Sequence, residues 1–144
     1  MTETTVVVAD DQPILRDALV DFIGLFDEFR LTGAVSSGGE LLELIRGAAP
    51  DVAIVDIRMP GGGAGLLRAI RELAPATRIL VLSAAGEREI VMEMMASGAN
   101  GYLIKGELPV KVVEGLRAVV DGQRPVSDEL VDDEVRALLD RLPD

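Results

Sequence analysis

Short runs of apolar, often β-branched residues alternate along the chain with longer segments whose apolar residues recur every three or four positions. The short runs are typical of strands and the periodic segments of amphipathic helices. The sequence predicts strands at 5–9, 30–35, 51–56, 77–82 and 100–104, and helices that begin near residues 13, 38, 66, 90 and 109. Because the two kinds of segment alternate five times, the sequence predicts a doubly wound α/β fold with a five-stranded parallel sheet.

Two of these segments carry particular information. Val52 to Val55 is an unbroken apolar run, which is typical of a central strand buried on both faces, and it delivers Asp56 to its end. The first helical segment follows Pro13, and its apolar stripe is predicted at Ile14, Leu15, Ala18, Leu19, Phe22, Ile23 and Phe26. The central strand therefore places a carboxylate at the mouth of the sheet.

The last segment, residues 123–144, differs from the rest of the chain, so we expect a domain at 1–122 and a linker with a C-terminal helix at 123–144. Pro125 and Ser127 interrupt the chain, and apolar residues then recur at helical spacing at Val131, Val135, Leu138, Leu139 and Leu142. Two interpretations stay open. The helix packs back on the domain, or it is a linker or dimerisation helix that leads to something further along.

Composition limits the chemistry that this chain can perform. The 144 residues contain neither cysteine nor histidine and carry a formal net charge of −11. These facts disfavour disulfides, His or Cys metal sites, Ser-His-Asp catalysis and DNA binding by this chain alone. No apolar run approaches the roughly 20 residues of a membrane span, and the start resembles no signal peptide. We therefore expect a cytoplasmic protein without membrane contact.

Polar, potentially reactive residues stand where four of the predicted strands end. They are Asp10 and Asp11, Asp56, Ser83 and Lys105. In an open α/β sheet, the ligand site lies beyond the carboxyl ends of the strands. Two carboxylates about 4 Å apart repel by roughly 4 kcal/mol at an effective dielectric constant of ~20, so three acids with one lysine require a further cation. Oxygen ligands alone favour Mg²⁺, or Mn²⁺.

Magnesium, an aspartate, a hydroxyl and a lysine together describe a site for phosphoryl transfer. An ionised Asp56 can attack phosphorus without a general base, and Ser83 and Lys105 can bind the remaining oxygens. Each residue alone has an ordinary explanation, since Asp10 or Ser83 could cap a helix and Lys105 could be a solvated strand end. Only the combination, in this order on successive strands, favours the functional interpretation.

Over about residues 5 to 122, the sequence resembles the receiver domain of bacterial two-component response regulators. The subfamily that it resembles most is NarL/FixJ. The motifs that carry the resemblance are Val7-Val8-Ala9-Asp10-Asp11, Val55-Asp56-Ile57-Arg58-Met59-Pro60-Gly61, Leu82-Ser83-Ala84 and Gly98-Ala99-Asn100-Gly101-Tyr102-Leu103-Ile104-Lys105. The resemblance implies a flavodoxin-like sheet with strand order 2-1-3-4-5.

The resemblance also implies a role for each site residue. Asp56 is then the phosphoacceptor, and the metal ligands are Asp56, Asp11, Asp10 mostly through water, and the backbone carbonyl of Arg58. Lys105 is the partner of the phosphoryl group and Ser83 the switch hydroxyl. Tyr102 is the aromatic residue that swings inward on activation, although as the only tyrosine it could simply cover the edge of the sheet.

The implied function is a signalling switch. A sensor histidine kinase supplies the phosphoryl group, and a homodimer forms. Transcription is regulated through a helix-turn-helix domain outside this chain. The chain is then either an excised receiver or a stand-alone one. Chemistry is limited to autophosphorylation and autodephosphorylation of Asp56, so the protein is not otherwise an enzyme. Two alternatives are a phosphorylation-independent interaction module and a Mg²⁺-dependent aspartyl-phosphate phosphatase. The latter pattern has a second aspartate where this chain has Arg58.

One segment departs from the family pattern. After Met59-Pro60 the chain reads Gly61-Gly62-Gly63-Ala64-Gly65, which is one residue longer than the usual loop and lacks its aspartate. Glycine loses the most backbone entropy on ordering, so this sequence predicts a flexible loop. A flexible loop would position the Arg58 carbonyl poorly, with slower phosphorylation or an altered kinase contact as the expected consequences.

Overall fold

The computed structural model describes residues 3–143 and contains one five-stranded sheet in which neighbouring strands run parallel. Met1, Thr2 and Asp144, which belong to the two terminal segments of the sequence, lie outside the described residues. The strands are β1 (Thr4–Ala9), β2 (Phe29–Val35), β3 (Val52–Val55), β4 (Arg78–Ser83) and β5 (Gly101–Ile104). Their order in the sheet is β2-β1-β3-β4-β5, which confirms the predicted fold and strand order.

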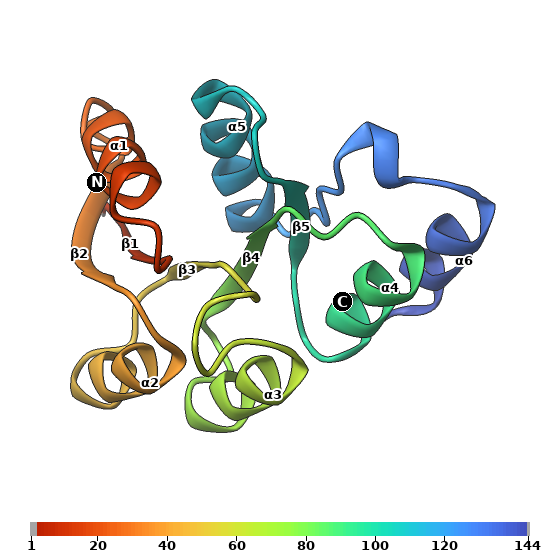
Figure 1. Ribbon diagram of the computed structural model, residues 1–144, viewed down its shortest axis with the longest axis horizontal. Helices are drawn as coiled ribbons and strands as arrows, with labels where there is room; N and C mark the ends of the chain where they lie inside the picture. The colour runs from red at the N-terminus through yellow and green to blue at the C-terminus, as the bar shows by residue number, and fades with distance from the viewer. Residues whose placement is uncertain (1–2, 144) are drawn as a thin grey trace.

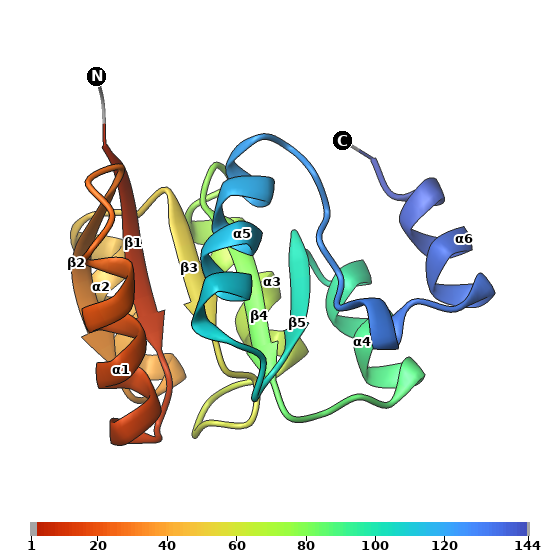
Figure 2. The same ribbon diagram turned by 90° about the horizontal axis from the view of Figure 1, so that it is seen from above.

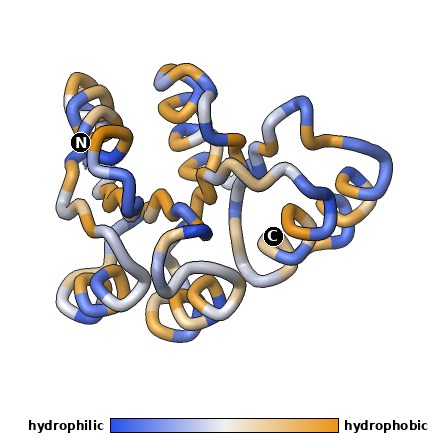
Figure 3. Tube along the Cα trace, in the orientation of Figure 1, coloured by the Kyte–Doolittle hydropathy of each residue, from blue (hydrophilic) through white to orange (hydrophobic). Residues whose placement is uncertain are grey.

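Helices cover both faces of the sheet (Figure 1). The elements are α1 (Pro13–Ile23), α2 (Gly38–Gly47), α3 (Ala64–Leu73), α4 (Arg88–Ala96), α5 (Pro109–Val120), the short 3-10 helix η1 (Asp128–Leu130) and α6 (Asp133–Arg141). Helices α1 and α5 lie on one face, and α2, α3 and α4 lie on the other. Along the turns of these helices, hydrophobic and hydrophilic positions alternate (Figure 3), as expected of elements that bury one stripe. Between residues 3 and 143, no helix has the length and the apolar character needed to cross a membrane.

Two hydrophobic clusters, one on each face, hold the sheet. Successive side chains of a strand point to opposite faces, so Val52 and Ile54 of β3 join the cluster under α1 and α5, whereas Ala53 and Val55 join the other. All four residues of β3 are buried, as predicted for a central strand. This central position explains why the end of β3 is fixed firmly enough to carry a site.

The prediction for the first helix was wrong in two respects. Helix α1 ends at Ile23, and Phe26 lies beyond it with its ring centroid 5.4 Å from that of Phe22. Ile14 is 88% exposed. Leu15 and Leu19, one turn apart, occupy the stripe that faces the core, so Ile14 lies beside that stripe at the solvent-facing start of the helix.

The tail packs back on the domain, which is the first of the two predicted interpretations. The backbone N–H of Tyr102 on β5 donates to the carbonyl of Pro125 (2.9 Å), and that of Ser127 donates to the carbonyl of Tyr102 (3.0 Å). Helix α6 then lies against α4 (Figure 2), with Val135 fully buried among the core residues of that face. The tail therefore extends the sheet at β5 and covers α4, and the division at residue 122 stays a prediction.

Candidate functional site

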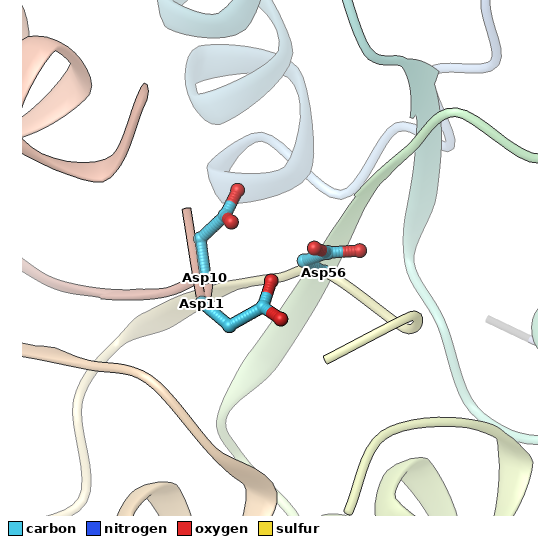
Figure 4. A group of neighbouring side chains, drawn as sticks. All are labelled: Asp10, Asp11 and Asp56. Atoms are coloured by element: carbon cyan, nitrogen blue, oxygen red, sulfur yellow. The ribbon is translucent and has the colours of Figure 1, made fainter. Parts of the chain in front are cut away.

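The acidic residues of the site follow two neighbouring strands (Figure 4). Asp10 and Asp11 come directly after β1, and Asp56 comes directly after β3. The ladder between these strands continues one step further, because the N–H of Asp56 donates to the carbonyl of Ala9 (2.9 Å). One carboxylate oxygen from each of the three aspartates lies within 4.8 Å of the others. The predicted convergence of these three residues is therefore present.

Lys105 lies among these acids. It follows β5, and its backbone N–H donates to the carbonyl of Ser83 (2.8 Å), which extends the ladder between β4 and β5. Its Nζ lies 3.0 Å from Oδ2 of Asp56 and 3.1 Å from Oδ2 of Asp10. Burial lowers the pKa of Lys105, but hydrogen bonds to the two carboxylates outweigh that effect, and its pKa lies above the ordinary lysine value. Lys105 thus stays protonated and neutralises part of the acidic charge.

Gln12 also contributes to this site, although no role was predicted for it from the sequence. Its side-chain oxygen accepts a hydrogen bond from Lys105 Nζ (2.5 Å), and its backbone N–H donates to Oδ1 of Asp10 (2.8 Å). A signal was present, because Gln12 follows the acidic pair and stands immediately before the helix that begins at Pro13. Gln12 holds the lysine and the acid in their relative positions.

The residues present fit a hard divalent cation. Oδ2 of Asp10 is buried and, although it lies beside the Lys105 ammonium, it accepts no hydrogen bond within the described residues, so a further cation or a water molecule can bind it. Asp11 is exposed, so the cluster is open to solvent on one side, as suits an ion that keeps several waters. The N–H of Arg58 donates to Oδ1 of Asp56 (2.9 Å), whereas a metal-binding role for the Arg58 carbonyl stays a prediction.

Ser83 and Tyr102 lie on the two strands beside this cluster, and both are fully buried. The Ser83 hydroxyl accepts a hydrogen bond from the N–H of Ala85 (3.1 Å), and the Tyr102 hydroxyl donates to the carbonyl of Ala85. Ala85, in the segment between β4 and α4, therefore connects the two hydroxyl groups. The Tyr102 side chain is buried between this segment and the tail, and its role as a switch stays a prediction.

Tyr102 leads to a prediction about pH. Burial raises the pKa of Tyr102 above its ordinary value of 10.0. Because the pKa is higher in the folded protein than in the unfolded chain, the stabilisation that Tyr102 contributes is complete below pH 10.0 and is lost as the pH rises through the folded value. Tyrosinate absorbance measures this directly, since the chain has one tyrosine and no tryptophan. We expect a midpoint above 10.0 in the folded protein, and a lower one in denaturant; equal midpoints would contradict the buried position.

The glycine loop is held by backbone hydrogen bonds. The N–H of Gly38 donates to the carbonyl of Pro60 (2.8 Å), and the N–H of Gly62 donates to that of Met59 (2.9 Å). Gly61 and Gly63 have φ angles of 76° and 103°, which other residues rarely adopt. The glycines thus permit a defined turn between the site and α3. The predicted consequences for phosphorylation rate and kinase contact stay predictions.

Chemically, the arrangement offers an ionised carboxylate with charge compensation beside it. Asp56 is 3% exposed. Its Oδ1 accepts a hydrogen bond from the Arg58 N–H, and its Oδ2 accepts one from Lys105 Nζ. A carboxylate so oriented can act as a nucleophile toward an electrophile that approaches from the open, Asp11 side. The same lysine can bind an anionic group once that group is attached to Asp56.

Comparisons with known proteins agree with this geometry. The family model described as the response regulator receiver domain matches residues 6–117. A NarL transcriptional regulatory protein of Mycobacterium tuberculosis is 36% identical over 127 residues, which are 88% of this chain and 59% of that protein. The nitrate/nitrite response regulator NarL of Escherichia coli K12 is 31% identical over 127 residues, again 88% of this chain and 59% of the relative.

Solved structures show the same architecture. The signal receiver domain of the M. tuberculosis NarL response regulator superposes with a TM-score of 0.81 at 35% identity, covering 85% of this chain and 100% of that one. A LuxR-family two-component response regulator from Aurantimonas gives a TM-score of 0.84 at 26% identity, covering 90% of this chain and 93% of that one. The chain thus spans all of an isolated receiver domain but about three fifths of the length of the curated relatives it matches.

Proposed function

The chain belongs to the response regulator receiver family, and from this premise we propose that Asp56 accepts a phosphoryl group in a Mg²⁺-dependent reaction. The observation that supports the proposal most is the cluster itself. Three aspartate oxygens lie within 4.8 Å of one another, with Lys105 Nζ 3.0 Å from the proposed nucleophile. A purely structural cluster of three acids around one lysine has no evident benefit, because the like charges repel.

The reaction requires little acid–base chemistry from this chain. An oxygen of Asp56 forms a bond to phosphorus while the bond between phosphorus and the donor breaks; acetate leaves acetyl phosphate as the free anion, whereas the imidazole of a phosphohistidine takes up a proton from water. For a phosphohistidine donor, the broken bond is the one to the imidazole nitrogen. Bound Mg²⁺, held by Asp10, Asp11 and Asp56, would neutralise charge on the transferring oxygens. Lys105 and the Ser83 hydroxyl would bind oxygens of the acyl phosphate, and water would later hydrolyse it.

The new charge would then change the protein surface. A phosphoryl group adds about −1.5 to −2 charge at neutral pH. If the Ser83 hydroxyl turns toward it, the N–H of Ala85 loses its acceptor, and the carbonyl of the same residue is the one that holds Tyr102. The segment before α4, which contains Ala85, would move when the Ser83 hydroxyl turns. We therefore propose Ser83 and Tyr102 as the switch residues that report the state of Asp56 to α4 and the tail.

The proposed partners follow from the same premise. A sensor histidine kinase would donate the phosphoryl group, and exposed apolar residues suit a docking surface near the site. Ile14 and Leu108, 88% and 68% exposed, stand at the starts of α1 and α5, on the same edge of the sheet as Asp56. Because the matched relatives are transcriptional regulators of which this chain spans 59%, we propose that DNA is bound through a further domain and that the regulator acts as a homodimer.

The alternatives receive no support from the comparisons. No matched relative reported above is a phosphatase, and Arg58 occupies the position of the second aspartate that such an enzyme would use. The intact acidic cluster with Lys105 likewise disfavours a module that works without phosphorylation.

Incubation with acetyl phosphate tests the proposal without a kinase. We expect intact-mass measurement to show the gain of a single phosphoryl group in the presence of Mg²⁺, a similar gain with Mn²⁺, and none in EDTA. Failure to gain the group in any of these conditions, or an equal gain with and without metal, would oppose the proposed reaction.

A further inference from the structure

A second concave site lies at the opposite edge of the sheet from Asp56. It is a pocket of about 510 Å³ between the turn from α3 to β4, the turn from α4 to β5, and the tail. Arg78 is the first residue of β4, whereas Ser83, at the other end of that strand, lies beside the acidic site. Figure 2 shows that the starts of β4 and β5 and the C-terminal end of α6 are on the same side of the molecule. The pocket is thus separate from the phosphoryl site.

Three arginines line this pocket in a protein whose net charge is −11. Arg71, Arg78 and Arg124 are half-buried, and within the described residues no carboxylate oxygen lies within 4.0 Å of their charged nitrogens. Their hydrogen bonds all go to neutral oxygens. Arg78 and Arg124 each donate one, both 3.3 Å long, to the backbone carbonyls of Val120 and Leu142. Arg78 also borders a smaller pocket that Glu3 and Asp51 line, but three partly desolvated like charges without a directly paired carboxylate are costly unless an anion joins them.

Arg71 is fixed in place by the turn that follows α4. Its guanidinium donates to the carbonyls of Gly98 (3.1 Å) and Pro75 (2.8 Å) and to the side-chain oxygen of Asn100 (3.0 Å). Its side chain runs against Gly98, where a Cβ would lie 2.6 Å from Arg71 Cγ. Burial, together with the positive charge of Arg78, lowers the pKa of Arg71. The guanidinium is therefore oriented before any ligand arrives.

A structural role alone explains only part of this arrangement. Arg71 ties α3 to the turn before β5, and a neutral amide could not match its three bonds. The single long bonds of Arg78 and Arg124 do not require a charge, since a neutral donor would satisfy the same carbonyls. Each guanidinium has five N–H donors, so most donors of these two residues form no hydrogen bond within the described residues.

We propose that this pocket binds a phosphate-bearing small molecule. Guanidinium groups match phosphate oxygens in bidentate geometry, and three of them suit a dianion. The volume is within the roughly 300–1,000 Å³ of typical ligand pockets, and Met95, Ala99 and Leu142 provide an apolar wall for the uncharged part of the ligand. Because Arg124 and Leu142 belong to the tail while Arg71 belongs to α3, a bound anion joins the tail to the domain.

Nuclear magnetic resonance titration of the full chain with inorganic phosphate tests the proposal, in EDTA and at constant ionic strength. We expect saturable shifts at the amides of Gly98 and Asn100, with none at Asp10 or Asp56. A nucleoside monophosphate, titrated in parallel, is expected to shift these amides and also Met95 and Ala99. If both ligands bind equally and only Gly98 and Asn100 shift, the ligand is a free phosphate and the apolar wall has no part in binding, which overturns that part of the proposal.

A matched pair of double variants separates the pocket from general charge effects. Arg78→Gln with Arg124→Gln is expected to weaken phosphate binding by about tenfold for each guanidinium removed. Arg46→Gln with Arg136→Gln removes the same charge from exposed positions outside the pocket and is expected to leave the affinity unchanged. Equal weakening in both pairs, or the absence of saturation in the native chain, overturns the proposal. If the first pair does not fold, Arg78→Gln alone carries the comparison.

Discussion

The Asp56→Asn variant is expected to form no phosphoryl adduct under conditions in which the native chain forms one. The amide lacks the ionised oxygen that attacks phosphorus, but it keeps a side-chain oxygen that can accept the hydrogen bond from Arg58. The loss should therefore be complete although the variant stays folded. Intact mass after incubation with acetyl phosphate and Mg²⁺ measures the adduct, and a thermal melt confirms the fold.

The Asp21→Asn variant is the matched control, since Asp21 is exposed on α1 away from the acidic cluster. It should be modified as completely as the native chain. Retention of the adduct in Asp56→Asn would assign the phosphoryl group to another side chain, and peptide mapping would identify which one. A loss in both variants would show that the effect is not specific to the site.

Among the variants described, Lys105→Met is expected to cause the largest loss of folding stability. Without the ammonium group, the carboxylates of Asp10 and Asp56, both almost fully buried, lose the cation between them. Removing one partner of a buried ion pair costs about 3–5 kcal/mol; since the site is open near Asp11, we expect the lower end of this range. Urea unfolding in EDTA measures the loss.

Two further measurements distinguish charge repulsion from lost packing. Adding Mg²⁺ should recover part of the stability of Lys105→Met, and so should a second change, Asp10→Asn, which removes one of the repelling charges. Lys111→Met is the control, because Lys111 is the only other lysine of the chain and its side chain is 56% exposed on α5. If the two lysine variants lose equal stability, or neither rescue works, the ion pair does not stabilise the fold as argued.

Local sequence pattern predicts the strands of this protein better than the exposed positions of its helices. The apolar run before Asp56 identified the central strand, and parallel strands bring their carboxyl ends to one edge. The meeting of Asp56 with Asp10 and Lys105 followed once the family resemblance supplied the strand order. The exposure of Ile14 did not follow. Helical periodicity shows that a stripe exists but does not fix which residues of the first turn belong to it, and Ile14 lies beside the stripe in solvent.

Features that several segments form together could not be predicted from the sequence either. The pattern of α6 is the same for a free helix and a docked one, so it could not reveal that Val135 is fully buried or that Arg88 pairs with Asp132. Each arginine of the second pocket was an ordinary polar residue when considered alone. Only the approach of α3, β4 and the tail in three dimensions brings Arg71, Arg78 and Arg124 together.

The pairing of residues 125–127 with β5 also protects the sheet against association with other molecules. An uncovered strand at the edge of a sheet presents N–H and C=O groups that can recruit a strand from a neighbouring chain and begin aggregation. Here the N–H of Tyr102 donates a hydrogen bond to Pro125, and the C=O of Tyr102 accepts one from Ser127. A fragment cut after residue 122, where the motif-based boundary falls, would uncover this edge together with the apolar side of α4. The unit that stays soluble in isolation is therefore expected to include the tail.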